Sequence, residues 1–336
     1  MKYGCLKKRE WDKLLEQFLL SHTIFANIEN EFGLDYELIG ADDIARISYN
    51  KPKPVTSLKS FFLPVAENVT AAIQDEKPRI ILGVPNCDIE GLSILDEIYL
   101  DNEYYDTFYG KHRKNTILIS SDCNSINENC HCLSYDIKPY SITHADIAIN
   151  LLDDIIFLRI ITPGGEDLVN RMSAATFECE DGVTSAVEMA HKATEALLLE
   201  TNEGLPGYKE SGRLINDSGG DIWVKYASHC VSCGACVTIC PTCSCFLLID
   251  KPGLEKIKHT DGCQYPGFER VAGGEDPLHE LHNRFRNRYM CKYVWKPEKF
   301  SSPACTGCGR CIDACIGKIS KNEIFMEMAK HLVNAD

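Results

Sequence analysis

Closely spaced cysteines are the residues in this sequence whose chemistry is most sharply defined. Two runs, CVSCGACVTICP and CTGCGRCIDAC, both have the spacing C-x2-C-x2-C-x3-C. This spacing is typical of bacterial ferredoxins, in which the last cysteine of each run binds the cluster of the other run. We therefore predict two [4Fe–4S] clusters with crossed ligands. The first is held by Cys230, Cys233, Cys236 and Cys315, and the second by Cys305, Cys308, Cys311 and Cys240.

The residues between these cysteines also suit clusters. Small residues such as Ser232, Gly234, Gly307 and Gly309 let the backbone wrap closely and point its amides at sulfur. The first run ends in proline, but the second has Ile316 instead. Because proline there stops a helix, its loss predicts a change of local shape rather than of ligation. Structural zinc is the alternative, although zinc sites pair two short C-x2–4-C knuckles rather than two runs of four cysteines.

A second group of cysteines lies in the N-terminal half. Cys87 follows the apolar stretch RIILGV at 79–84, and Cys123 follows NTILIS at 115–120. Both stretches predict strands, and the helical-looking IEGLSILDEIYL between them gives the order of a parallel α/β unit. Ligand sites in open α/β sheets lie beyond the carboxyl ends of neighbouring strands. We therefore predict a third [4Fe–4S] cluster, held by Cys87, Cys123, Cys130 and Cys132.

The alternative for this group is that Cys87 and Cys123 are small core residues, since free cysteine is often buried. The C-x-C of the NCHC loop makes that alternative less attractive. His131 stands between the two cysteines of this loop, and we expect it to point away from the metal.

Six cysteines remain outside these groups. Four of them lie between or beside the ferredoxin runs and are numerous enough for one more cluster: Cys243, Cys245, Cys263 and Cys291. Equally, they could pack as hydrophobic residues that shield the other clusters from water. The sequence leaves both alternatives open. The last two, Cys5 and Cys179, are expected to be free thiols, because the chain has no secretion signal and cytosolic thiols stay reduced.

The predicted elements divide the chain into two parts. An amphipathic helix is expected at 9–20 and another helix at 182–200, with strands in DIAINLLDDIIFLRIIT between them. The Gly-rich, polar stretch 202–220 predicts a linker or loop. We therefore expect an α/β domain with one iron–sulfur cluster over residues 1–215, and a mainly helical ferredoxin-type domain with two clusters over residues 216–336.

Several function classes are excluded by composition and missing motifs. A formal charge of −14 argues against a sequence-independent grip on nucleic acid. No apolar run approaches the ~20 residues of a membrane span. The chain has neither a G-x-G-x-x-G after a strand nor a G-x4-G-K-[ST], so nucleotide binding is not predicted. We therefore expect a cytoplasmic protein with protein partners.

The basic and aromatic segment HNRFRNRYMCKYVWK stands out in this acidic chain. We interpret it as positive charge that stabilises reduced clusters or docks a partner. A solvated helical face is the alternative. No set of residues in the sequence indicates substrate chemistry. We therefore expect the chain to pass electrons on without acting on a substrate. The alternative is an enzyme that reduces a small molecule at a cluster with a non-cysteine ligand or an open iron.

Longer stretches carry a resemblance to a known family. The most specific are NCDIEGLSILDEIYLD, NCHC, CPTCSCF, GCQYPGFERVAGG and RFRNRYMCK. With these pieces the chain resembles the β subunit of cytoplasmic sulfhydrogenases, the NADP-linked nickel–iron hydrogenases, and more distantly an iron–sulfur subunit of anaerobic sulfite reductase. The resemblance runs from about Lys77 to about Cys315, and Cys291 is similar to the sulfhydrogenase form. Ile316 departs from both families, which have proline there.

The resemblance implies a set of partners. In such complexes a separate flavoprotein subunit binds FAD and NAD(P)H, and the iron–sulfur subunit relays single electrons to the catalytic subunits. These would be of the nickel–iron hydrogenase type or, alternatively, of the sulfite reductase type. Both families share the N-terminal cysteine group and the two ferredoxin runs, together with positions matching Cys243, Cys245 and Cys263.

Overall fold

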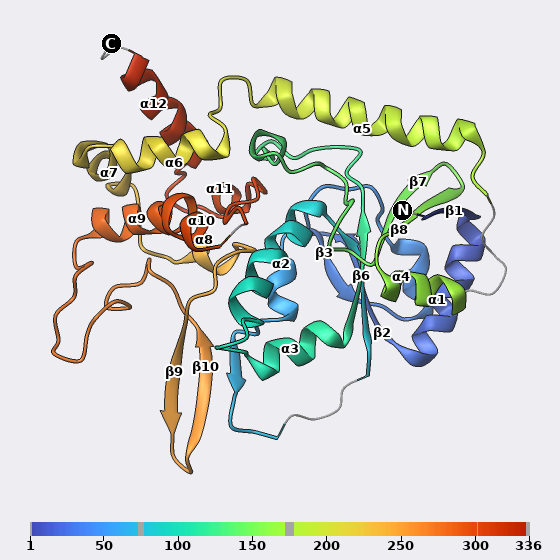
Figure 1. Cartoon of the computed structure of the whole chain (residues 1–336), viewed down its shortest axis with the longest axis horizontal. Helices are drawn as coiled ribbons and strands as arrows, with labels where there is room; N and C mark the ends of the chain where they lie inside the picture. The colour runs from blue at the N-terminus through green and yellow to red at the C-terminus, as the bar shows by residue number, and fades with distance from the viewer. Residues whose placement is uncertain (1, 73–76, 172–177, 301, 334–336) are drawn as a thin grey trace.

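A seven-stranded mixed sheet forms the N-terminal part of the computed structural model, which describes residues 2–72, 77–171, 178–300 and 302–333 (Figure 1). The strand order is β1-β8-β7-β6-β5-β2-β3. The central strands β2, β5, β6 and β7 are parallel, and the outer pairings are antiparallel. The strands are β1 (Lys2–Lys7), β2 (Thr23–Asn30), β3 (Gly33–Leu38), β5 (Arg79–Val84), β6 (Thr116–Ser121), β7 (Ile147–Leu152) and β8 (Ile155–Ile160).

Helices cover both faces of this sheet, which explains why its central strands are apolar throughout. In β5, Ile80 and Leu82 enter one core with α1, whereas Ile81 and Val84 enter a second core with α2 and α3. In Figure 1 the long helix α5 runs along one side of the molecule, from the β1 end toward the C-terminal helices. These helices are α1 (Lys8–Ser21), α2 (Asn86–Tyr99), α3 (Thr107–Lys114), α4 (Pro163–Arg171) and α5 (Asp181–Thr201), with short 3₁₀ turns η1 (Ala41–Arg46), η2 (Leu58–Phe61) and η3 (Leu133–Tyr135).

The C-terminal part is built mainly from short helices around an aromatic core. Trp223, Phe285, Tyr289 and Phe325 are among its buried residues. The helices are α6 (Tyr208–Asp217), α7 (Gly220–Ala227), α8 (Ala235–Thr238), α9 (Leu281–Met290), the π-helical turn η4 (Cys291–Trp295), α10 (Lys296–Lys299), α11 (Arg310–Asp313) and α12 (Lys321–Val333).

The prediction of a loop over 202–220 was wrong, because α6 lies within it. Leu214 and Ile215 are buried in the C-terminal core and Tyr208 packs against it. With the buried Ser211, they form one buried face of the helix at a spacing of three to four residues. The predicted division between residues 215 and 216 falls inside the same helix. That division stays a prediction.

A small second sheet joins the two parts of the chain. β4 (Ala66–Asn68) pairs with β10 (Glu255–Thr260), which also pairs with β9 (Phe246–Lys251). The β9–β10 hairpin projects from the body of the molecule (Figure 1). None of the helices in the described parts of the chain is long and apolar enough to cross a membrane.

Cys5 and Cys179 form a disulfide, so the expectation of free thiols was wrong. Cys5 is fully buried on β1, in a small core with Phe157 and Val187, and Cys179 packs against the same core. The expectation rested on the redox compartment and could not foresee that the fold places two residues 174 positions apart with their Cα atoms 5.2 Å from each other.

Candidate metal centres

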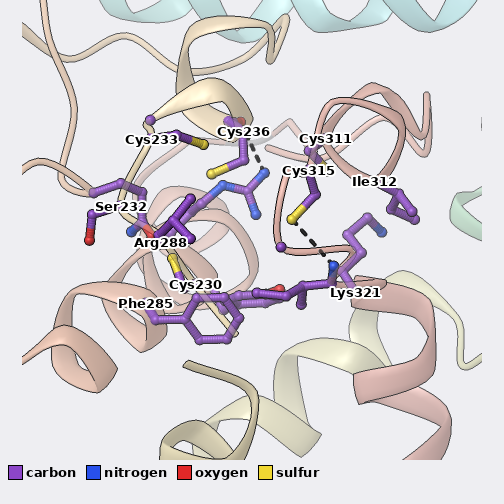
Figure 2. A pocket seen from close by; sticks show the side chains of 16 residues that line it. Cys230, Ser232, Cys233, Cys236, Phe285, Arg288, Cys311, Ile312, Cys315 and Lys321 are labelled. Carbon is purple, nitrogen blue, oxygen red and sulfur yellow. Dashed lines mark hydrogen bonds between the residues drawn. The ribbon is translucent and has the colours of Figure 1, made fainter. Parts of the chain in front are cut away.

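The first cavity, which we call the Cys230 cavity, brings together cysteines from both ferredoxin runs. Figure 2 shows cysteines of the first run on one side of the Arg288 guanidinium and Cys315, from the second run, on the other. The backbone amide of Ile319 donates to the Cys315 sulfur at 3.3 Å. The cavity is lined by Cys230, Cys233, Cys236, Cys311 and Cys315, together with Arg288 and Lys321.

The second cavity, the Cys305 cavity, shows the reciprocal crossing. Its cysteines come from the second run except for one, which ends the first run: they are Cys240, Cys305, Cys308 and Cys311. Arg288, Lys292 and Lys321 bring three positive charges to its wall. The structure thus places together the two crossed sets that the spacing predicts, while iron binding by these residues stays a prediction.

Glycines allow the chain to turn at both cavities. Gly234 and Gly309 precede the short helices α8 and α11 in the left-handed conformation, with φ of 70° and 76°. A Cβ on Gly234 would lie 2.2 Å from the Tyr265 ring, and one on Gly309 would lie 2.3 Å from the carbonyl oxygen of Asn129. A larger residue would therefore push the neighbouring segments away from the cavities.

Two buried polar groups at these cavities lack a hydrogen-bond partner within the described chain. They are Nε of Arg288, which lies at both cavities, and Oγ1 of Thr306, at the Cys305 cavity. Arg288 also donates from Nη2 to the carbonyl oxygen of Cys236 at 3.2 Å. Because buried polar groups are almost always satisfied, these unpaired donors fit sites that hold cluster sulfur.

The third cavity, the Cys87 cavity, lies at the carboxyl ends of two parallel strands. Cys87 is in the first turn of α2, directly after β5, and Cys123 follows β6. Since β5 and β6 are neighbours in the sheet, both side chains reach the same place, as predicted. The loop before η3 supplies the other two cysteines. The cavity is lined by Cys87, Cys123, Cys130 and Cys132, together with Lys53, Gly307 and Cys308.

The second ferredoxin run packs directly against this N-terminal site. The amide of His131 donates to the carbonyl oxygen of Gly307 at 2.9 Å. Arg310, almost fully buried, donates to the Asp88 carboxylate at 2.5 and 2.8 Å. Cys308 lines both the Cys87 and the Cys305 cavities. The three cavities therefore form a row, with the Cys305 cavity in the middle.

His131 is engaged elsewhere than with the predicted metal. Its Nδ1 lies 2.7 Å from the carbonyl oxygen of Asn129, and its Nε2 lies 2.6 Å from the ammonium of Lys321. Burial and the Lys321 charge hold the pKa of His131 well below its usual range. A neutral imidazole that donates from Nδ1 and accepts at Nε2 agrees with both contacts.

Burial opposes ionisation of several of these cysteines until a cation is present. Burial raises the pKa of the Cys87 and Cys123 thiols well above the usual range, and it raises the pKa of Cys236 to about 11. Iron ligands must be thiolates. The positive charge of iron and of the surrounding lysine and arginine side chains offsets the cost of holding several thiolates in one buried place.

In the described ranges, no three His, Cys, Asp or Glu side chains converge as the ligands of a single metal ion would. A cubane cluster needs a wider arrangement, because its four thiolates surround a volume several ångströms wide.

The buried cations come from a segment that the sequence had marked as basic. Arg284, Arg288 and Lys292, spaced four residues apart, are 7%, 6% and 2% exposed. The alternative of a solvated face was therefore wrong for these residues. Lys53 and Lys321, by contrast, carried no signal in the sequence, because isolated lysines are usually exposed.

Comparison with known proteins agrees with this arrangement. Residues 229–319 match the family model described as a 4Fe-4S dicluster domain. The chain is also 27% identical over 311 residues to "Sulfhydrogenase 2 subunit beta" of Pyrococcus furiosus, covering 89% of this chain and 90% of that protein. This chain is a homologue of that protein. The match to the dicluster domain implies at least two [4Fe–4S] clusters within residues 229–319.

Proposed function

We propose that this chain relays single electrons between a flavoprotein subunit, which binds FAD and NAD(P)H, and a catalytic subunit of the nickel–iron hydrogenase type. The observation that carries the proposal is the row of three cavities. The middle one shares Cys308 with the Cys87 cavity, and it shares Cys311, Arg288 and Lys321 with the Cys230 cavity. Neighbouring centres separated by one side chain suit electron transfer.

Three [4Fe–4S] clusters are proposed for this row. Each has four cysteines as ligands: Cys230, Cys233, Cys236 and Cys315; Cys305, Cys308, Cys311 and Cys240; and Cys87, Cys123, Cys130 and Cys132. When bound, such clusters take up and release one electron without making or breaking substrate bonds.

The residues around these clusters hold them, exclude water and set their charge balance. Arg288 and Lys321 lie between two cavities, and Lys53 donates from Nζ to the Cys130 sulfur at 3.8 Å in the third. Positive charge near a cluster favours its reduced, more negative form. No residue of the chain is required to act on a substrate.

The partners follow from what the chain lacks and from its relative. The sequence has no nucleotide-binding motif of the two kinds sought, so the flavin and pyridine nucleotide belong on another subunit. The relative's name contains the word sulfhydrogenase, which favours a hydrogenase over a sulfite reductase as the acceptor. We place the complex in the cytoplasm, without nucleic acid or membrane partners.

Anaerobic purification of the tagged chain from its native host tests this function. We expect a flavoprotein and nickel–iron subunits to copurify, and we expect NAD(P)H or hydrogen to reduce clusters that EPR spectroscopy detects. A siroheme subunit in place of nickel–iron subunits would favour the sulfite reductase alternative. A pure chain that contains zinc and no iron would overturn the redox role.

A further inference from the structure

The fold brings together the segments that carry the four cysteines for which the sequence left two alternatives open. The four cysteines come from three separate segments: the loop before β9, the segment after β10, and the start of η4. They are Cys243, Cys245, Cys263 and Cys291. We propose that they hold a fourth [4Fe–4S] cluster, in addition to the three of the proposed relay.

Hydrogen bonds attach the first two of these segments to the α9–η4–α10 helices. Lys296 donates from Nζ to the carbonyl oxygen of Thr242 at 2.8 Å and to Oγ of Ser244 at 2.9 Å. Gln264 donates from Nε2 to the Cys263 sulfur at 3.7 Å and lies 2.6 Å from the carbonyl oxygen of Arg284. Cys243, Cys245 and Cys263 are thereby held beside the helices that carry Cys291.

The base of the hairpin brings two of the cysteines together. The amide of Asp261 donates to the carbonyl oxygen of Cys245 at 3.2 Å, and Cys263 follows two residues later. This hydrogen bond holds the segments of Cys245 and Cys263 side by side at the base of the hairpin.

The backbone is irregular at the fourth cysteine. A π-helical turn begins at Cys291, and the amide of Lys296 donates to the Cys291 carbonyl. Such turns are rare and often occur at functional sites. The wider turn places Cys291 and Lys296 on the same side of the helix, and Lys296 contacts Thr242 and Ser244, the residues beside Cys243 and Cys245.

Buried lysines distinguish a cluster from simple apolar packing. Lys59 is 5% exposed and lines none of the three cavities of the row. It lies within electrostatic range of Cys243, and its hydrogen-bond partner in the described chain is the neutral carbonyl oxygen of Val237. Lys292, 2% exposed, donates to Oγ1 of Thr242 beside Cys243, but it also lines the Cys305 cavity, so the middle cluster shares its charge. Burying ammonium groups beside neutral thiols would be costly, whereas an anionic cluster offsets that cost.

The site adjoins the middle of the row. Thr242, which directly precedes Cys243, has its Oγ1 3.3 Å from the Cys240 sulfur, and Cys240 lines the Cys305 cavity. A cluster here could therefore exchange electrons with the middle cluster. Electrons could then leave the relay at a second place.

Iron and acid-labile sulfide analysis of the anaerobically purified chain tests the proposal. We expect about 16 irons for the unmodified protein and about 12 for Cys245→Ser or Cys263→Ser. Cys179→Ser is the control, since it breaks the Cys5–Cys179 disulfide, which lies outside all four groups, and its iron content should not change. About 12 irons in all of these proteins would overturn the fourth cluster. So would one zinc per chain that Cys245→Ser removes.

Alkylation provides a second readout that does not depend on folding of the variants. We expect Cys245 and Cys291 of the native anaerobic protein to resist iodoacetamide as strongly as Cys230 does, and to react once a chelator has removed iron. Both side chains are partly exposed, so at a pH of about 9 or above, where more of each thiol is ionised, free thiols would react without a chelator. Modification of Cys245 and Cys291 at full iron content would overturn the proposal.

Discussion

At the scale of single residues, the groups of cysteines that lie together could be predicted, whereas the charges that accompany them could not. Cysteine spacing is fixed by the shape of a cluster and is therefore visible in the sequence. The lysines and arginines around the cavities come from positions far apart in the chain, such as Lys53, Arg288 and Lys321. Only the folded chain shows that they are buried.

Lys321 illustrates how such a charge acts. Its ammonium lies 2.6 Å from Nε2 of His131 and 3.2 and 3.1 Å from the hydroxyls of Tyr135 and Tyr293. All these partners are neutral. Since Lys321 lines both the Cys230 and the Cys305 cavities, its charge is available to two clusters.

Replacing this lysine should make both clusters harder to reduce. For Lys321→Met we expect the midpoint potentials to fall by on the order of 100 mV, as the loss of a unit charge a few ångströms away implies at an effective dielectric constant of about 20. In Lys321→Arg, which keeps the positive charge, the midpoint potentials of both clusters should stay close to those of the unmodified protein. EPR-monitored redox titration measures the shift.

Lys225→Met is the matched control for the loss of a lysine charge. Lys225 is exposed and pairs with Glu327 at 2.7 Å, so solvent screens its charge. Equal potentials in Lys225→Met and Lys321→Met would contradict the proposed role of Lys321.

At the scale of elements, the strands were easier to predict than the contacts between loops. The apolar stretches at 79–84 and 115–120 correspond to β5 and, within one residue, to β6, because a strand covered on both faces must be apolar throughout. The polar segment that forms α6 was mistaken for a loop, since its helix is stabilised by packing on the C-terminal core. The contact of the second ferredoxin run with the NCHC loop has no local signal at all.

Gly307 lies at that contact and should not tolerate a side chain. A Cβ there would lie 2.6 Å from the Cα of Cys132 and 2.6 Å from the carbonyl oxygen of His131. We expect Gly307→Ala to separate the two loops and to lose about four irons per chain or more. Iron analysis and thermal unfolding under anaerobic conditions measure the effect.

Gly253→Ala separates this contact from backbone strain. Gly253 also has a positive φ, of 85° against 66° for Gly307, but no atom lies within 4 Å of its Cβ position. The Gly253→Ala substitution should lower Tm by only about 2–4 °C, as about 1 kcal/mol of backbone strain implies. The variant protein should keep its full iron content. If Gly307→Ala behaved in the same way, the close contact between the loops would be unimportant.

At the scale of the whole molecule, the two ferredoxin runs and the N-terminal domain form one continuous array. The sequence predicted three groups of cysteines and the crossing of the two runs. It could not predict the order of the groups in space, because that order depends on Gly307 and Cys308 reaching the carboxyl ends of β5 and β6. The middle position of the Cys305 cavity would make its cluster the connection between the other two proposed clusters.

Cys240→Ser tests both the crossing and the order. Although Cys240 belongs to the first run, its side chain lines the Cys305 cavity, so we expect its replacement to damage the middle cluster and to remove about four irons per chain. The two outer clusters should still be reduced by dithionite. In the intact complex, however, NAD(P)H should reduce only the cluster on the flavoprotein side, because the connection to the far side is lost. Rapid-freeze EPR of the complex distinguishes the two sides, and reduction of both outer clusters at the unmodified rate would show that electrons do not pass through the middle.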